Sequence, residues 1–402
     1  MKRKNTHFKK TTYSNWIIVL SIIACCFTKS LSAQKFIDNT VDFFTIPLSK
    51  DSVVNEGQYP SKIVLAPIVA FRPISGFGAG LGSVLLFKPK NAGTETRTSN
   101  ATLAGIYTTE SQLLVPGTYT IFFPEEKWIL SGEFEFRDFP TVYYGIGNNT
   151  RTENEGEIAL TGFEADPILY RNLTSKLYAG LGVHYNHTWE VDVERDGNTG
   201  QMNSSFGDDI VARDFTAAGL QLGLLWDSRD NINSPTKGMY GLLQHNVYED
   251  VLGGDTSFRM LQAQFRNYFQ PFKNSKGIFA WELYGRFTWG DEIPIPELSS
   301  LGGDVRLRGY EAGRYVDRNA IAAQVEYRFP IHNRIGGAAF FGAGDVFEDS
   351  SDLEFDLIKY STGVGLRLAL DKKERLNARF DYGFGFGQES DSGFYVSISE
   401  SF

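Results

Sequence analysis

Apolar and polar side chains alternate along most of this chain, from Lys62 to its last residue. In the segment AIAAQVEYRF, which ends at Phe329, one face is apolar and the other carries Gln324, Glu326 and Arg328. A period of two is typical of β-strands, and an apolar face opposite a charged one is typical of strands in a membrane barrel. The alternation therefore predicts an all-β protein. The clearest segments are 128–136, 215–226, 261–269, 279–289, 320–329 and 376–386.

Turn-rich breaks separate about 16 such segments. A tilted strand of about 10 residues is long enough to cross a bilayer. We therefore predict a transmembrane β-barrel of roughly 16 antiparallel strands over residues 62–402. A soluble β-sandwich is the alternative, since its strands also alternate. Its outer faces would be more polar than the faces seen here.

The first 33 residues resemble an export signal, with a basic start, an apolar core over 16–27 and a small-residue cut site after Ala33. An alternative is a lipoprotein signal that leaves Cys25 acylated. Cys25 and Cys26 are the only cysteines, so the exported chain would have no disulfide and no thiolate metal site. Residues 34–61 form a short predicted periplasmic segment, which is either a short helix with Ile37 and Val41 on one face or a disordered lead-in to the barrel.

The net charge of −9 becomes −15 once the six basic residues of the predicted signal are removed. No basic stripe remains for phosphate contacts, which excludes a nucleic-acid partner. Acidic residues gather in predicted loops such as 153–157 and 348–352. They are either solvated loops or sites where divalent cations bridge the protein to outer-membrane lipid and lipopolysaccharide.

Three motifs lie in the last two-fifths of the chain. They are a strand-turn motif with Asp227, Arg229, Asp230, Pro235 and Gly238; the loop sequence VRLRGY, with Arg308, Gly309 and Tyr310; and strands with QVEYR around Glu326 and FFGAGDVF. Together they resemble the bacterial surface antigen domain, the β-barrel of the BamA–TamA-type outer-membrane superfamily. Residues 34–61 are too short for the periplasmic POTRA domains of that superfamily, so the chain resembles a minimal member.

The resemblance implies that the loop at about 291–315, between strands 11 and 12, folds into the barrel. Gly309 permits a sharp turn, and Arg308 offers a guanidinium that we expect to pair with Glu326. Many relatives have an inward aspartate where this chain has Gly342. Asp345 has the opposite parity, and only a bulge would turn it inward.

The chain ends on an alternating segment in which Phe394, Val396 and Phe402 are expected on one face. A terminal aromatic such as Phe402 resembles the signal for outer-membrane assembly, although Glu400 departs from it. Pro67 in the first predicted strand removes a hydrogen-bond donor, and Gly393 begins the last strand. A weak seam between strands 1 and 16 is the expected consequence.

These features predict an integral protein of the bacterial outer membrane that assists protein or lipid insertion or translocation through the seam. The alternative is a passive channel or structural barrel without a client. An enzyme is not expected: no nucleophile has an informative spacing, and His184 and His187 lie on opposite faces of a strand. We expect no metal or cofactor. A protein or lipid client, a periplasmic partner and a homodimer all remain open.

Overall fold

The computed structural model describes residues 31–48, 61–72, 76–194, 210–211, 213–273, 275–291, 293–387 and 390–402. The chain divides into two compact units, residues 1–46 and 47–402. In the first unit, the predicted helix around Ile37 and Val41 is present as α2 (Leu31–Phe43). The predicted signal lies mostly outside the described residues, and its expected cut after Ala33 falls in the first turn of α2. No described helix is long and apolar enough to cross a membrane.

The second unit is built on one large sheet. Its strands, in chain order, are β2 (Lys62–Arg72), β3 (Gly76–Phe87), β4 (Ser99–Thr108), β5 (Leu113–Phe122), β6 (Trp128–Asp138), β8 (Gly156–Ala165), β9 (Ile168–Thr174), β10 (Leu177–Glu194), β12 (Phe215–Asp227), β13 (Gly238–Tyr248), β14 (Phe258–Phe269), β15 (Ile278–Gly290), β19 (Asn319–His332), β20 (Ile335–Phe347), β21 (Lys359–Asp371), β22 (Leu376–Phe386) and β23 (Asp391–Ile398).

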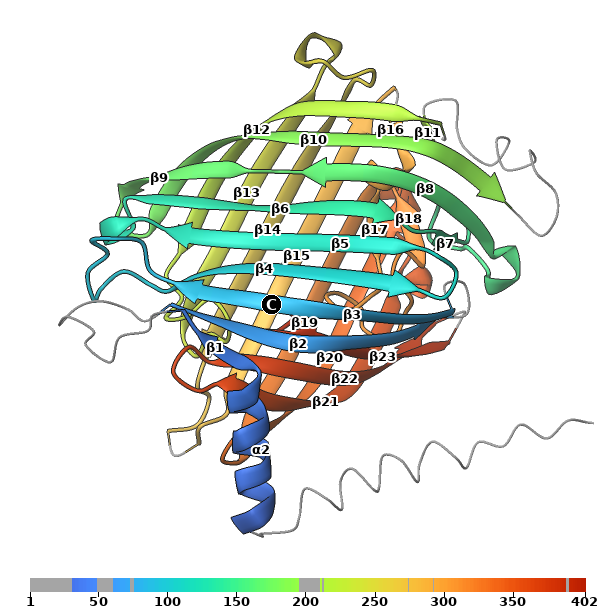
Figure 1. The fold of residues 1–402 in the computed structure, drawn as a ribbon. Helices are drawn as coiled ribbons and strands as arrows, with labels where there is room; N and C mark the ends of the chain where they lie inside the picture. The colour runs from blue at the N-terminus through green and yellow to red at the C-terminus, as the bar shows by residue number, and fades with distance from the viewer. Residues whose placement is uncertain are drawn as a thin grey trace, which may run out of the picture. The chain divides into compact units, whose positions relative to one another are not determined.

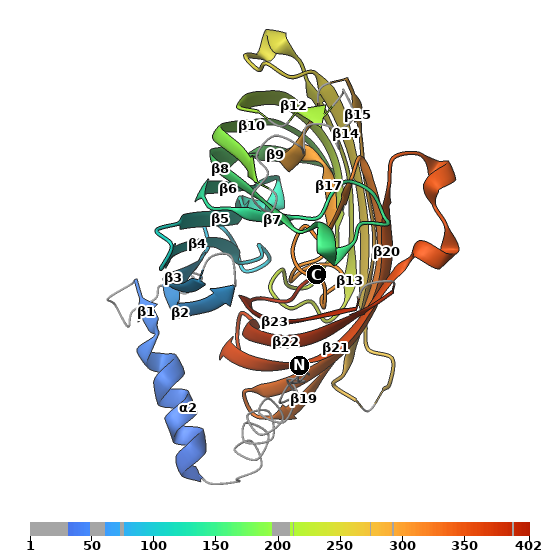
Figure 2. The same cartoon turned by 90° about the vertical axis from the view of Figure 1, so that its right-hand side faces the viewer.

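Apart from β8 and β9, which do not pair with each other, each of these strands pairs antiparallel with its neighbour along the chain. β8 and β9 share one position, because both lie between β6 and β10 and are separated only by Asp166 and Pro167. The sheet curls around so that its first strands come to lie beside its last, β22 and β23 (Figures 1 and 2). This arrangement is the large antiparallel β-architecture that the alternation predicts.

The alternation also located individual strands well. The predicted segment 376–386 is β22 itself, and β12 and β15 extend their predicted segments by one residue at one or both ends. The agreement is close because a period-two pattern this long has no competing helical interpretation.

Burial on the sheet is the reverse of that in a soluble protein. On β12, Leu220, Leu222 and Leu224 are about half exposed, at 44%, 53% and 47%, whereas Gln221 is 1% exposed. The same inversion occurs on β19, where Val325 is exposed and its polar neighbours are buried. A broad apolar outer surface with polar groups inside requires a hydrocarbon environment.

The remaining elements are short and lie in the connections. They are β1 (Thr45–Pro47), η1 (Pro124–Glu126), β7 (Thr141–Tyr143), η2 (Thr152–Asn154), β11 (Ile210–Val211), η4 (Asp250–Leu252), β16 (Ile293–Pro294), η5 (Ile295–Glu297), β17 (Ser299–Leu301), β18 (Tyr315–Asp317), η6 (Ser350–Asp352) and η7 (Phe355–Leu357).

Candidate functional site

The connection between β15 and β19 carries the Leu-Arg-Gly-Tyr motif. It contains β16, η5 and the paired strands β17 and β18. Between β17 and β18 the chain reverses direction at Gly302, Gly303 and Gly309, whose φ angles are 111°, 95° and 127°. Such positive angles favour glycine. The Gly303 N–H donates to the Tyr310 carbonyl oxygen at 3.0 Å, so the turn closes around Arg308.

Arg308 is buried and bridges two strands of the sheet. Its Nη2 lies 2.6 Å from Glu326 Oε2 on β19, and its Nη1 lies 2.5 Å from Asp381 Oδ2 on β22. The guanidinium also stacks 3.6 Å from the ring centre of Phe340. The expected Arg308–Glu326 pair is therefore present in the structure. Asp381 is a second partner that the sequence interpretation missed.

Three further arginines surround the same two carboxylates. Arg328 and Arg367 donate to Glu326 Oε1 at 2.7 Å and 3.2 Å. Arg367 and Arg379 donate to Asp381 at 2.5 Å and 3.1 Å. We call the set of Arg308, these three arginines and the two carboxylates Glu326 and Asp381 the anchor network. It links the loop to β19, β21 and β22.

Two more carboxylates balance the charge of the anchor network. Glu400 Oε2 lies 2.6 Å from Arg367 Nε, and Asp304 Oδ2 lies 2.9 Å from Arg379 Nη2. Four guanidinium groups therefore face four carboxylates, a balance that a buried site requires. A buried ionic network of this kind is better suited to fixing one conformation than to adding stability.

Glycines let the loop and the wall approach each other closely. A Cβ on Gly309 would lie 2.5 Å from the Phe384 carbonyl carbon, and one on Gly383 would lie 2.4 Å from the Arg308 carbonyl oxygen. A Cβ on Gly385 would lie 2.5 Å from the Tyr310 ring. The face of β22 that carries Gly383 and Gly385 is therefore the surface on which the loop lies.

Two tyrosines connect the loop to the last strands. The Tyr310 hydroxyl donates to the Phe386 carbonyl oxygen at 2.5 Å. The Tyr395 hydroxyl, from β23, accepts a bond from the Gly309 N–H at 2.9 Å and donates to the Tyr310 carbonyl oxygen at 2.8 Å. Tyr395 is thus a direct link between the loop and the edge strand β23. Nothing in the sequence pattern distinguished it from other tyrosines.

The residues near Gly342 differ from what the family resemblance suggested. The β19–β20 ladder stays regular through Asp345, so no bulge turns this carboxylate toward Arg308. Asp345 instead pairs with Lys359 at 2.9 Å. Gly342 lies against the loop, with its Cβ position 3.3 Å from Leu307 Cδ2. The second carboxylate for Arg308 comes from β22 rather than β20.

The expected position of Phe402 was wrong. β23 ends at Ile398, and Ser399 has a φ of 73°, so the chain leaves the strand before its last residue. Phe402 is 4% exposed and packs with Tyr268, whereas Val396 on β23 is 55% exposed. The ion pair of Glu400 with the anchor network holds this tail against the polar face. Phe402 therefore does not continue the apolar face of the last strand.

β2 and β23 are the first and last long strands of the sheet, and we call their junction the seam. Among the described residues no backbone ladder joins them: β23 pairs with β22, and the long ladder of β2 is with β3. Side chains do meet across this junction. Lys62 forms an ion pair with Asp371, and Val64 clusters with Leu376 and Ile398.

The predicted strand-turn motif connects distant parts of the sheet. Asp227 bonds Arg229 Nε at 3.0 Å and Arg97, from the β3–β4 connection, at 2.8 Å. Gly238 has a φ of 105°, and a Cβ there would lie 2.2 Å from the Ser228 carbonyl oxygen. Pro235 is buried in the same turn.

Asp230 closes the turn and ties it to the β21–β22 connection. Its Oδ1 accepts the Thr236 N–H at 2.9 Å, and its Oδ2 lies 2.7 Å from Arg375 Nη1. Burial alone would raise the pKa of Asp230, but the hydrogen bonds from Thr236 and Arg375 outweigh it and lower the pKa. The Asp230 carboxylate of the folded protein is therefore ionised near neutral pH.

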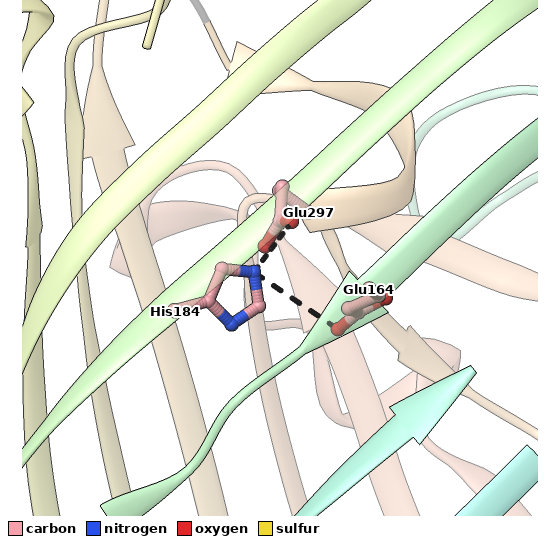
Figure 3. Close-up of side chains that lie close together, drawn as sticks. All are labelled: Glu164, His184 and Glu297. Atoms are coloured by element: carbon pink, nitrogen blue, oxygen red, sulfur yellow. Dashed lines mark hydrogen bonds and ion pairs between the residues drawn. The ribbon is translucent and has the colours of Figure 1, made fainter. Parts of the chain in front are cut away.

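A second buried polar cluster lies where the same loop meets β8 and β10. His184 Nε2 lies 3.1 Å from Glu297 Oε1 and 4.0 Å from Glu164 Oε1 (Figure 3). Asn186 donates to the same Glu297 oxygen at 2.8 Å. His184 is buried while His187 is not, as their opposite faces predict. Glu297 lies 113 positions from His184, so spacing along the sequence could not have suggested this cluster.

Residues 97–402 match the Omp85 superfamily domain. The chain belongs to the Omp85 superfamily. It is therefore an outer-membrane β-barrel protein of this family, as the motif resemblance implied. A search of curated proteins found no match to the chain.

Two solved structures share the Omp85 fold of this chain. BamA from Haemophilus ducreyi lacking POTRA domains 1–3 has a TM-score of 0.54 and 16% identity, over 92% of this chain and 78% of that one. CdiB from Acinetobacter baumannii has a TM-score of 0.52 and 12% identity, over 84% of this chain. The match spans 59% of the CdiB chain. At such low identity these likenesses establish the fold alone.

In this Omp85 protein the strongest candidate for a functional site is the seam, together with the loop and tail beside it. The anchor network, Tyr395 and Glu400 connect these three parts through buried polar contacts. Such an arrangement can set how firmly the edge strand β23 is held.

Proposed function

We propose that residues 62–402 form a closed barrel of roughly 16 strands, with the β15–β19 loop inside it, that helps a protein or a lipid enter or cross the outer membrane. The count takes β8 and β9 as one interrupted strand and leaves the short connecting strands aside. The seam between β2 and β23 is the part that opens. No covalent chemistry is involved in this role.

The observation that carries the proposal is the unpaired seam. In the described residues every other pair of neighbouring long strands is held by a backbone ladder, but only side chains join β2 to β22 and β23. An unpaired strand edge is a template for another strand, and unsatisfied backbone groups in lipid are costly. The seam is therefore the place where the barrel opens most readily and where a client strand would gain most by pairing.

The loop supports this role by holding the last strand from inside. Tyr395 bonds the loop backbone at two points, and Glu400 joins the tail to Arg367. These contacts hold β23 and its tail without backbone pairing to β2. The barrel can then open at the seam while the other strands stay in register.

Photo-cross-linking in living cells tests the proposed function. A photoreactive residue at Val69 or Val396 faces outward beside the seam, and one at Leu222 faces outward on another part of the sheet. We expect nascent barrel proteins or a specific lipid to be labelled from the two seam positions and not from Leu222. Identical labelling from all three positions would contradict a client-handling seam.

Conductance separates this role from that of a passive channel. The loop and the tail occupy the polar face of the sheet, so we expect the protein to show little steady conductance in a planar bilayer. A stable open pore that widens in Arg308→Ala would favour the channel instead. Closed behaviour with brief openings would agree with a gated seam.

A further inference from the structure

We propose that Glu164, His184 and Glu297 bind one divalent transition-metal ion of the zinc class. The inference concerns a different part of the loop from Arg308, and it does not depend on the proposed role of the seam. Glu164 comes from β8, His184 from β10 and Glu297 from η5 (Figure 3). One ligand atom from each lies within 4.8 Å of the others.

The donor set suits zinc better than calcium or magnesium. Imidazole nitrogen and carboxylate oxygen are both zinc ligands, with bond lengths of about 2.0–2.2 Å, whereas the two harder ions prefer oxygen alone. Ligand atoms on a tetrahedral ion are then roughly 3.3 Å apart. His184 Nε2 already lies 3.1 Å from Glu297 Oε1, and Glu164 Oε1, at 4.0 Å, needs only a small side-chain rotation.

A surplus of negative charge surrounds these ligands. Glu135 lies directly opposite Glu164 in the β6–β8 ladder, and like charges in such a pair repel each other. Asp166 lies at the end of β8, where it accepts the Glu133 N–H at 2.6 Å. Two guanidinium groups are close enough to pair with these acids, one of them from Arg137 at 2.8 Å from Glu164.

The second guanidinium belongs to Arg286, 3.6 Å from Glu297 Oε2. The four carboxylates of Glu164, Glu297, Glu135 and Asp166 therefore lie near two guanidinium groups, and a proton on His184 offsets only one of the two remaining charges. A divalent cation would offset two and would leave the imidazole neutral, as a metal ligand must be.

An unpartnered amide beside the cluster is an independent observation. Gln221 is 1% exposed, and neither its side-chain nitrogen nor its oxygen has a partner in the described residues. It pairs opposite Gly182, so it shares the face of the sheet that carries His184. Its Oε1 lies 2.7 Å from the Cβ position of Gly182, two residues before the histidine. A bound ion or its water would give this buried amide the partner that it lacks.

A metal ion at this cluster would fasten the loop to the sheet a second time. Arg308 holds the loop to β19 and β22, whereas Glu297 would be held to β8 and β10 through the ion. Two attachments on separate strands restrict the loop far more than one. The site is therefore a structural clamp, with no substrate bound at the metal.

Calorimetric titration of the purified full chain with Zn²⁺ tests the proposal after removal of metals with a chelator. We expect one Zn²⁺ per chain, with affinity at least about 100-fold weaker in His184→Asn and in Glu297→Gln. His187→Asn is the matched control, because it lies on the opposite face of the same strand and bonds Thr216. Co²⁺ bound in place of Zn²⁺ should give visible absorption bands that His184→Asn abolishes and His187→Asn keeps.

The result that would overturn the proposal is the absence of stoichiometric binding, or binding of equal strength in His184→Asn and His187→Asn. The cluster would then be an ion pair between a protonated His184 and Glu297. If Glu297→Gln fails to fold, Glu164→Gln serves instead, because that side chain is only partly buried. It must also weaken Zn²⁺ binding, and unchanged affinity would count against the site.

Discussion

Arg308 is the residue on which the loop's position depends most. It is a single guanidinium that contacts carboxylates on two different strands and the face of Phe340. Lysine could not reproduce this, because its ammonium is a compact point charge without the planar fork. The role of Arg308 is therefore one of geometry as much as of charge.

Replacing Arg308 with alanine should destabilise the folded protein. The change leaves the buried carboxylates with one cation too few, and breaking a buried ionic contact costs about 3–5 kcal/mol. We expect the free energy of unfolding to fall by an amount near the lower end of this range, because Arg328, Arg367 and Arg379 still pair with the carboxylates. Denaturant unfolding in detergent would measure it. Arg151→Ala is the control, since its exposed pair with Glu153 should contribute less than about 1 kcal/mol.

Gly309→Ala tests the close approach of the loop to β22. A Cβ there combines a φ of 127° with a contact 2.5 Å from the backbone of Phe384. Gly253→Ala is a matched control, because Gly253 has a φ of 94° and open space around its Cβ position. We expect the first variant to cost at least about 1 kcal/mol more than the second. Equal losses would mean that the loop is not tightly packed on β22.

The sequence predicted one of the two carboxylates that pair with Arg308. Glu326 was predictable, because it lies on the polar face of the strand that follows the loop. Asp381 lies on the polar face of its strand beside Gly383 and Gly385, but nothing indicated that β22 would curl around to face Arg308. The predicted position of Phe402 was wrong because the pattern of apolar and polar residues does not show that the backbone changes direction at Ser399.

At the scale of elements, the loop's short sheet of β17 and β18 is sensitive to pH through Asp317. Burial, with added repulsion from Glu348 and Asp352, raises the pKa of Asp317 to about 6. An unfolded aspartate has a pKa of about 3.9. Since the folded value is the higher one, the stabilising effect is complete below the unfolded pKa and is lost as pH rises through 6.

We therefore expect amide protons of β17 and β18 to be better protected from exchange near pH 5 than near pH 7. Hydrogen exchange, corrected for the intrinsic pH dependence, measures this. In Asp317→Asn the difference should disappear. Protection that rises with pH in the unmodified protein would contradict the assigned direction.

The contact between β23 and the loop can be tested with Tyr395→Phe. The change removes the hydroxyl that accepts the Gly309 N–H and donates to the Tyr310 carbonyl oxygen. An unsatisfied buried donor costs about 1–3 kcal/mol, so amide exchange in β23 should accelerate. Tyr382→Phe is the control, because its hydroxyl bonds Ser392 in an exposed position. Similar acceleration of amide exchange in both variants would contradict a specific role of Tyr395 in holding β23 to the loop.

Elements were predicted from the sequence more reliably than the contacts between them. Strands such as β12, β15 and β22 follow directly from the alternation, because every second side chain of a barrel strand faces lipid and is therefore apolar. The interruption of β8 and β9 at Asp166 and Pro167 was not predicted. This interruption depends on how two neighbouring strands bend together, and the sequence of one segment alone does not determine that.

For the whole molecule, the central claim is that the barrel closes through a seam without continuous backbone pairing. Pro67 and Gly393 suggested such a weak junction from the sequence. The clusters at Arg308 and at His184 were less predictable as a whole, because the curling sheet brings together residues more than 70 positions apart, as with Arg308 and Asp381. Only Glu326 lay near enough in sequence to be paired in advance.

Disulfide trapping across the seam tests this claim most directly. The protein without its predicted signal has no cysteine, so pairs can be placed at Val69 with Phe394 and at Val69 with Val396, all exposed on the outer face. Tyr382 with Phe394 is the control pair, since the two lie opposite each other in the β22–β23 ladder. We predict that Val69→Cys forms disulfides slowly and incompletely with cysteines at both partner positions, and that the control pair forms its disulfide rapidly and completely. Rapid, complete disulfide formation by Val69→Cys with one partner position alone would show a fixed, fully paired junction and would contradict the account.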